Sequence, residues 1–207
     1  MNLRKKLKLY VITDRRLKSE IESVREALEG GATSIQLRIK NAPTGEMIKI
    51  GKEIRELTKE YDALYFVDDR LDVALATDAD GVQLGPEDMP ISLAKEIGPN
   101  LIIGASVYSL EEALKAEKEG ADYLGAGSVF PTPTKRDVKV IGLEGLKRIV
   151  ESVKIPVVAI GGINHKNARD VLKTGVDGIA IISAIMGAED VKRATEEMRK
   201  IIEEVLR

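Results

Sequence analysis

The sequence contains no cysteine, no tryptophan and a single histidine, His165. Without cysteine there can be no disulfide, no thiolate metal site and no thiol nucleophile. One histidine gives no support for a Ser-His-Asp triad or a His-rich metal site. It follows a Gly-Gly-Ile-Asn stretch, and we expect it to be exposed in a loop. No strong general base stands out elsewhere, so the chain suits a reaction with little proton transfer.

The chain also lacks an excess of either charge. Its 32 Lys and Arg residues stand against 34 Asp and Glu, for a formal net charge of -2. Without a polycationic surface, nucleic acid and anionic membranes are not expected partners. Segment 1–8 is basic, but no long apolar run follows it, so neither a signal peptide nor a transmembrane helix is predicted. We therefore expect a cytoplasmic enzyme or binding protein; the sequence leaves a homo-oligomer open.

Short apolar runs alternate with longer amphipathic stretches along the whole sequence. Eight runs have the apolar character of parallel strands buried on both faces: 9–13, 34–37, 64–67, 81–84, 101–105, 123–126, 157–160 and 178–182. Helical patterns cover 19–30, 44–61, 71–77, 91–97, 109–120, 142–153, 167–174 and 189–206. Related phrases precede several strands (EGGATSIQ, ATDADGVQ, KEGADYLG, KTGVDGIA), and no linker divides the chain.

This pattern predicts one domain, residues 1–207, folded as a (β/α)8 TIM barrel in which an outer ring of helices surrounds the closed parallel strands. The alternative is an open doubly wound sheet, although such sheets usually have fewer strands. In a barrel the active site lies at the carboxyl ends of the strands. The residues that follow each predicted strand are therefore the candidates for chemistry.

Small residues after the seventh and eighth strands predict a phosphate site. Gly161 and Gly162 would let an anion approach bare backbone amides, and a helix expected from Asn167 adds its positive end. Ser183 and Ala184 follow the eighth strand, where barrels commonly bind phosphate. Most Gly-Gly pairs only mark turns, but this position favours a functional site.

Carboxylates after the third and fourth strands predict a hard divalent cation. Asp69 and Asp88 end adjacent strands, with Asp68 and Glu87 beside them, and oxygen ligands suit Mg²⁺. Two alternatives stay open: Asp69 could pair with Arg70, and Asp88 could cap the next helix. Taken together at neighbouring strand ends, the two carboxylates favour a metal.

Three cations, Arg38, Lys40 and Lys135, follow core strands and are expected in the same ring of side chains. Lysine and arginine are commonly solvated surface charges. At strand ends they are better explained by a second polyanion, such as a leaving diphosphate.

Six segments, in order, resemble the thiamine phosphate synthase family over essentially the whole chain: YVITDR (10–15), QLRIK (36–40), DDRLDVALATDADGVQLGPEDMP (68–90), VFPTPTK (129–135), AIGGIN (159–164) and ISAI (182–185). VFPTPTK together with GPEDMP is specific, whereas AIGGI recurs in many phosphate-binding barrels. The resemblance implies a transferase that condenses 4-amino-2-methyl-5-(hydroxymethyl)pyrimidine diphosphate with 4-methyl-5-(2-phosphoethyl)thiazole, or its carboxylated form. Diphosphate would depart first, and the thiazole nitrogen would capture the pyrimidine-stabilised cation.

The resemblance also implies residue roles. Asp69 and Asp88 would bind Mg²⁺. The residues closest to the chemistry would be Arg38, Ser106 and Lys135. The two substrates would be bound by Gln36, Leu37, Arg38, Ile39, Lys40, Asp68, Ser106, Thr132, Pro133, Thr134, Lys135, Gly162, Ile182 and Ser183. Within this set, residues 36–40 and Lys135 would hold the pyrimidine diphosphate, and Ser106 would contact the pyrimidine. The thiazole phosphate would be held by Thr132, Thr134, Gly162, Ile182 and Ser183.

Four positions depart from the usual pattern of the family. Asp68 stands where Asn is general, Ile39 where Glu is common, Gln83 where His is common and Pro86 where Gln is frequent. None removes a residue that the implied mechanism needs. Asp68 adds negative charge beside the expected metal, and the recognition of the pyrimidine is the part most affected.

Three other functions compete with this interpretation. A thiazole tautomerase of the same superfamily would carry a catalytic His in the loop after strand six, where this chain has Ser128. A non-catalytic sensor of thiazole phosphate would have no use for a metal pair and a diphosphate-binding lysine. An isomerase or aldolase barrel would need a placed base or a Schiff-base lysine, for which Lys135 is the candidate. We also expect the stretch 131–137 to be mobile without ligand.

Overall fold

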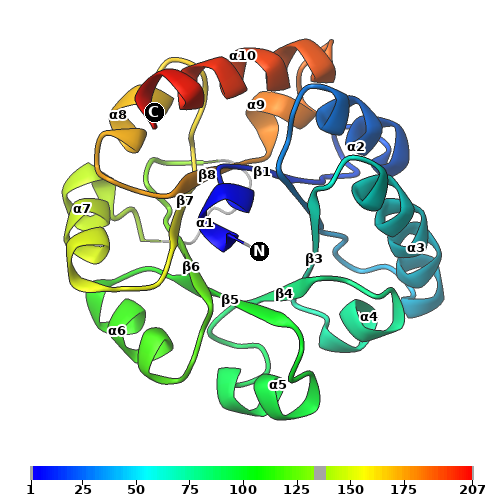
Figure 1. The fold of residues 1–207 in the computed structure, drawn as a ribbon, viewed down its shortest axis with the longest axis horizontal. Helices are drawn as coiled ribbons and strands as arrows, with labels where there is room; N and C mark the ends of the chain where they lie inside the picture. Colours follow the sequence, from blue (N-terminus) through cyan, green and yellow to red (C-terminus); the bar gives the residue numbers. More distant parts are fainter. Residues whose placement is uncertain (1, 133–138, 207) are drawn as a thin grey trace.

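The structure, a computed structural model, describes residues 2–132 and 139–206. Eight parallel strands form a closed barrel in chain order, with β8 paired to β1 (Figure 1). The strands are β1 (Leu9–Ile12), β2 (Ser34–Leu37), β3 (Leu64–Asp68), β4 (Gly81–Leu84), β5 (Ile102–Val107), β6 (Tyr123–Ala126), β7 (Val157–Ile160) and β8 (Gly178–Ile181). The predicted (β/α)8 barrel is confirmed, and the open sheet is excluded because the first and last strands pair.

Helices surround the strands as an outer ring (Figure 1). Their bounds are α2 (Glu20–Glu29), α3 (Thr44–Glu60), α4 (Leu71–Ala76), α5 (Ile91–Ile97), α6 (Leu110–Lys118), α7 (Gly142–Ser152), α8 (Ala168–Leu172) and α10 (Val191–Val205). Each lies inside a predicted helical stretch. Gly31, Gly120 and Gly175 end three of these helical segments with positive φ, as the left-handed C-terminal stop requires.

The sequence patterns missed two short helices, α1 (Leu3–Lys6) and α9 (Ser183–Met186). Helix α1 precedes the first strand, and in Figure 1 it lies across the centre of the ring of strands. Leu3 packs there against the residues of the barrel interior. At four residues each, these helices are too short for a hydrophobic period to reveal them.

The two faces of each strand belong to different cores, because successive strand residues point to opposite sides. Outward-facing residues such as Val11, Ile35 and Tyr65 pack against the helices in the larger core. Inward-facing residues fill the barrel itself: Leu7, Tyr10, Ile12, Leu64, Phe66, Tyr123, Val158 and Ala180. None of the described helices is long and apolar enough to cross a membrane.

Three aromatic rings fill the barrel interior. The ring centroids of Tyr10 and Phe66 are 5.2 Å apart, and those of Phe66 and Tyr123 are 5.4 Å apart. Tyr10 and Tyr123 lie at 6.2 Å. The floor under the carboxyl ends of the strands is therefore rigid and apolar, with the two phenol groups as its polar points.

Candidate active site

A cavity of about 340 Å³ opens at the carboxyl ends of the strands. Residues from all eight strands or the loops that follow them line it: Tyr10, Ile12, Gln36, Arg38, Lys40, Asp68, Asp69, Gln83, Gly85, Pro86, Glu87, Asp88, Ser106, Tyr108, Tyr123, Gly125, Gly127, Ser128, Thr132, Val158, Ile160, Gly161, Gly162, Ile163, Ala180, Ile182 and Ser183. A second cavity lies away from the strand ends, between α4, α5 and the start of β5. The first cavity is where the predicted site residues gather.

Of the residues to which the family resemblance gave a role, eleven line that cavity: Gln36, Arg38, Lys40, Asp68, Asp69, Asp88, Ser106, Thr132, Gly162, Ile182 and Ser183. Leu37 and Ile39 do not. Their side chains are buried in the core between strands and helices, because they alternate with Gln36, Arg38 and Lys40 along the chain. Pro133, Thr134 and Lys135, and most of the stretch expected to be mobile, lie outside the described residues.

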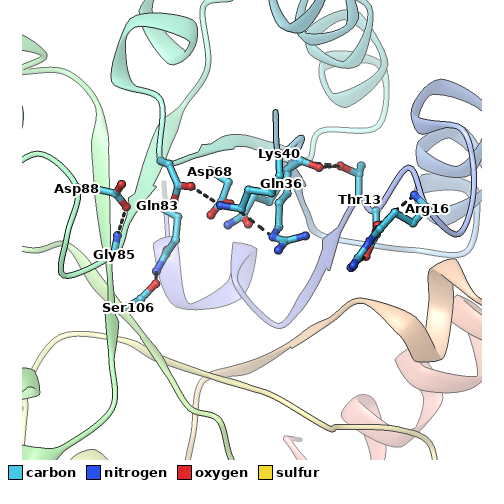
Figure 2. Close-up of polar contacts among 12 residues, drawn as sticks. Thr13, Arg16, Gln36, Lys40, Asp68, Gln83, Gly85, Asp88 and Ser106 are labelled. Atoms are coloured by element: carbon cyan, nitrogen blue, oxygen red, sulfur yellow. Dashed lines mark hydrogen bonds and ion pairs between the residues drawn. The ribbon is translucent and has the colours of Figure 1, made fainter. Parts of the chain in front are cut away.

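A charged cluster occupies one side of the cavity (Figure 2). The Lys40 ammonium lies 2.9 Å from an Asp68 carboxylate oxygen and also contacts Asp69. Arg38 Nε lies 3.6 Å from the same Asp68 oxygen. Burial raises the pKa of Asp68, and the neighbouring Asp69 adds to this, while Lys40 and Arg38 act in the opposite direction. Burial disfavours the charge of Lys40, but the two carboxylates outweigh it and raise the pKa of that ammonium group.

Asp69 and Asp88 meet at the edge of the charged cluster. Asp69 has a left-handed backbone (φ 63°), and its N–H donates to the Gln83 carbonyl at 2.9 Å, which ties the end of β3 to β4. Asp88 Oδ2 accepts the Gly85 N–H at 2.6 Å. Burial raises the pKa of Asp88; the Gly85 hydrogen bond lowers it, and the adjacent Asp69 carboxylate raises it further. Two interacting carboxylates are a favourable place for a cation.

Both alternatives to a metal role fail in the structure. Arg70 forms its ion pair with Asp72, at 2.6 Å, and its guanidinium also donates to Thr44. Asp88 closes the turn at Gly85, and the helix after it, α5, has no side-chain cap. Within the described part of the chain, however, no group of three or more His, Cys, Asp or Glu side chains is arranged to hold a metal ion.

The inner wall of the cavity carries hydrogen-bonded polar groups, and two of them, Tyr10 and Tyr123, were not singled out by the sequence patterns. Gln36 Nε2 donates to the Tyr10 hydroxyl at 3.0 Å, and that hydroxyl lies 3.0 Å from the Tyr123 hydroxyl. On the next strands, Gln83 Nε2 donates to Ser106 Oγ at 3.0 Å (Figure 2). Alternation along the strands would have indicated both tyrosines. Tyr10 shares its face of β1 with Ile12, Tyr123 shares its face of β6 with Gly125, and all four residues line the cavity.

The side of the cavity where phosphate binding is predicted is built from glycines packed against the loop after β6. Gly161 and Gly162 both have positive φ, at 103° and 65°. A side chain on Gly161 would collide with Ser128, and one on Gly162 with Phe130 and the Pro131 carbonyl. Asn167 does not cap α8 with its side chain; its amide donates to the Gly162 carbonyl at 3.0 Å and holds this turn in place. Bare backbone therefore faces the cavity, as expected.

Two expectations for residues near the strand ends differ from the structure: the exposure of His165, and a place in the cavity for the residues after β1. His165 is half-buried rather than exposed, with Nε2 2.8 Å from the Ala194 carbonyl, and it does not line the cavity. The polar residues after β1, Asp14 and Arg15, also do not line it. Asp14 binds Arg16 and the pKa of its carboxyl is lowered by that hydrogen bond, while Arg15 pairs with Glu20 at 2.8 Å.

Taken together, the fold and this cavity define a (β/α)8 barrel with a carboxylate pair, cations and bare glycine backbone around one opening at the carboxyl ends of the strands, where enzymes of this fold have their active sites. A sequence model described as thiamine monophosphate synthase matches residues 9–185. The chain belongs to this family.

Relatives support this over the full length. A thiamine-phosphate synthase of Pyrococcus furiosus is 83% identical over 206 residues, and one of Methanococcus maripaludis is 55% identical over 207; each comparison covers 100% of both chains. A solved structure of thiamine phosphate pyrophosphorylase from Pyrococcus furiosus superposes with a TM-score of 0.97 at 82% identity, again over 100% of both chains.

Proposed function

We propose that the protein is a transferase that condenses aminopyrimidine diphosphate with thiazole phosphate to give thiamine phosphate and diphosphate. One observation carries this proposal: three surfaces of different chemical character line the same cavity. These are the charged cluster around Lys40 and Asp69, the hydroxyl and amide groups of Ser106 and Gln36, and the bare backbone at Gly162. A diphosphate, a heteroaromatic ring and a monophosphate each match one of these surfaces.

The residues present fit Mg²⁺ as the cofactor. Asp69 and Asp88 supply only two carboxylates, which is fewer than a dedicated protein cage would have. Mg²⁺ is typically held by one or two carboxylates together with substrate phosphates and water. When bound, the ion would neutralise charge on the diphosphate and so make it a better leaving group.

The chain's own residues would divide the remaining work. Arg38 and Lys40 neutralise the departing diphosphate, and Lys135 is proposed to do so from the loop after β6. Lys40 already lies between two carboxylates, so an incoming diphosphate would compete with Asp68 and Asp69 for its ammonium group. Ser106 would contact the pyrimidine. The backbone at Gly162 and the side chain of Ser183 would hold the thiazole phosphate, which directs the thiazole nitrogen at the reacting carbon.

The lining residues also agree with a mechanism that needs little proton transfer. The described part of the lining contains no histidine. Burial raises the pKa of the Tyr10 and Tyr123 hydroxyls, so both stay neutral at physiological pH. A thiazole tautomerase would need a base after β6, but Ser128 at that position is engaged, since its hydroxyl donates to the Phe130 carbonyl at 2.6 Å.

The test is product formation from both substrates with Mg²⁺ and with EDTA. We expect diphosphate and thiamine phosphate only when both substrates and the metal are present. Asp88→Asn should lower kcat/KM by about a hundredfold or more, because it removes a ligand charge from the cation site. Asp72→Asn is the matched control, since Asp72 pairs with Arg70 outside the cavity and should not change activity.

Other outcomes would separate the competing functions. Turnover of thiazole phosphate alone would indicate a tautomerase. Tight binding of thiazole phosphate without product from the pair of substrates would indicate a sensor and refute the synthase proposal.

A further inference from the structure

Five polar side chains inside the barrel come from five different strands and form a group with two hydrogen-bonded halves. Gln36 on β2 donates to Tyr10 on β1, whose hydroxyl meets that of Tyr123 on β6. Gln83 on β4 donates to Ser106 on β5 (Figure 2). All five line the cavity. Between the two halves of the group there is one gap, from Tyr123 to Gln83.

The donors and acceptors on the two sides of that gap match each other. The Tyr10 oxygen accepts a hydrogen from Gln36, which makes the Tyr10 hydroxyl a stronger donor, and we assign its hydrogen to the Tyr123 oxygen 3.0 Å away. Tyr123 is then left with a hydrogen to donate. Across from it, Gln83 Oε1 is one of two buried side-chain polar atoms without a partner in residues 2–132 and 139–206, the other being Arg55 Nε.

The donor, the Tyr123 hydroxyl, and the unpaired acceptor, Gln83 Oε1, both lie next to Gly104 of β5. Both the Tyr123 hydroxyl and Gln83 Oε1 are closer than 3.0 Å to the position that a Cβ on Gly104 would take. The Gln83 amide nitrogen has the same relation to Gly125 on the next strand. Two glycines on neighbouring strands therefore make room for this amide. A buried acceptor left unpaired is costly, so a small rotation that joins it to the adjacent phenol is favourable.

We propose that these groups form one directional hydrogen-bond chain, Gln36 to Tyr10 to Tyr123 to Gln83 to Ser106, which fixes the hydrogen-bonding polarity of the pyrimidine site. At one end, one hydrogen of the Gln36 amide nitrogen goes to Tyr10, which fixes the orientation of the amide and leaves its carbonyl oxygen as the acceptor for the substrate. At the other end, Ser106 Oγ accepts from Gln83, so its hydrogen is presented as a donor.

This polarity matches one substrate edge and rejects its close analogue. A 4-aminopyrimidine offers an amine donor beside a ring-nitrogen acceptor, whereas the 4-oxo analogue offers a carbonyl acceptor beside a ring N–H. The chain could accommodate the analogue only by reversing several buried hydrogen bonds together. Sites that hydrogen-bond a substrate group discriminate strongly for this reason. Tyr10, Tyr123 and Gln83 are thus positioning residues, and the inference rests on the proposed function for the identity of the substrate.

The experiment compares kcat/KM for the 4-amino and 4-oxo pyrimidine diphosphates. Three variants each remove one member of the chain and with it the two hydrogen bonds of that member: Tyr10→Phe, Tyr123→Phe and Gln83→Met. In each we expect the preference for the amino substrate to fall by about tenfold or more, with KM for thiazole phosphate unchanged. Tyr65→Phe is the matched control, because the buried Tyr65 hydroxyl bonds Thr77 at 3.2 Å outside the barrel interior. It should lose stability without any change in preference.

Each outcome decides a different point. If the wild-type protein makes product but prefers the amino substrate less than about tenfold, the chain is refuted whatever the variants do. Unchanged preference in the folded variants, checked by circular dichroism, refutes it as well. If the wild type makes no product, the proposed function fails. Calorimetric binding of the amino and oxo pyrimidine alcohols to the wild-type protein then tests the polarity separately, and equal affinities would overturn it.

Discussion

Gly104→Ala is expected to destabilise the barrel although it adds only one methyl group to a strand. The new Cβ would lie closer than 3.0 Å to Gln83 Oε1 and to the Cζ and hydroxyl of Tyr123. The Tyr123 ring cannot retreat, because it is fully buried and packs on Phe66 at 5.4 Å and on Tyr10 at 6.2 Å. Overpacking of this kind costs about 1–3 kcal/mol. For a chain of this size that corresponds to a decrease in Tm of roughly 2–12 °C.

The assay is thermal unfolding followed by circular dichroism, with Gly45→Ala as the matched control. Gly45 lies exposed in α3, and a Cβ there would meet no atom within 4 Å. That substitution should raise stability by about 0.5–1 kcal/mol, because alanine loses less conformational freedom than glycine in a helix. A Tm for Gly104→Ala equal to or above that of the wild type would refute the close packing of Gln83 and Tyr123 over β5.

Three further predictions follow from other parts of the structure. Ile54→Ala, at a fully buried position of α3, should lower the free energy of unfolding by about 2–5 kcal/mol in urea titration. Asp14→Asn should cost about 1 kcal/mol at neutral pH, because the exposed Arg16 lowers the pKa of the Asp14 carboxyl. A lowered pKa stabilises the fold above the ordinary value of 3.8, so the difference from wild type should shrink as the pH falls below it. Lys40→Gln should raise KM for the pyrimidine diphosphate by about tenfold in steady-state kinetics, because Lys40 lies beside Asp68 in the charged cluster. KM for thiazole phosphate should not change. Equal effects on both KM values would contradict the proposed role of Lys40 in binding the diphosphate.

The sequence by itself determined the barrel, because its evidence is local. Each strand is a short apolar run, and each helix has its own hydrophobic period, so no knowledge of distant contacts was needed. Strand ends then located many residues of the cavity lining: Asp69, Asp88 and Gly162 follow strands, Ser106 lies near the carboxyl end of β5, and all four line one cavity. The family resemblance assigned the chemistry of these positions, which local patterns left open between a metal, an ion pair and a helix cap.

Strand geometry decides which way each side chain points, and two of the expected substrate contacts ignored this alternation. Leu37 and Ile39 were included with their neighbours, yet alternation turns them into the helix-facing core. His165 illustrates a different limit. It contacts the carbonyl of Ala194, a residue of α10, and nothing in the loop sequence around His165 indicates that contact.

Only the tertiary structure decided how the inside of the barrel is connected. Tyr10 and Tyr123 are 113 positions apart in the chain, and their hydroxyls meet because closure brings β1 and β6 across the same small interior. The room for Gln83 exists because glycines of two other strands, Gly104 and Gly125, lie beside it. Such contacts depend on the register of several strands at once, which local periodicity does not encode.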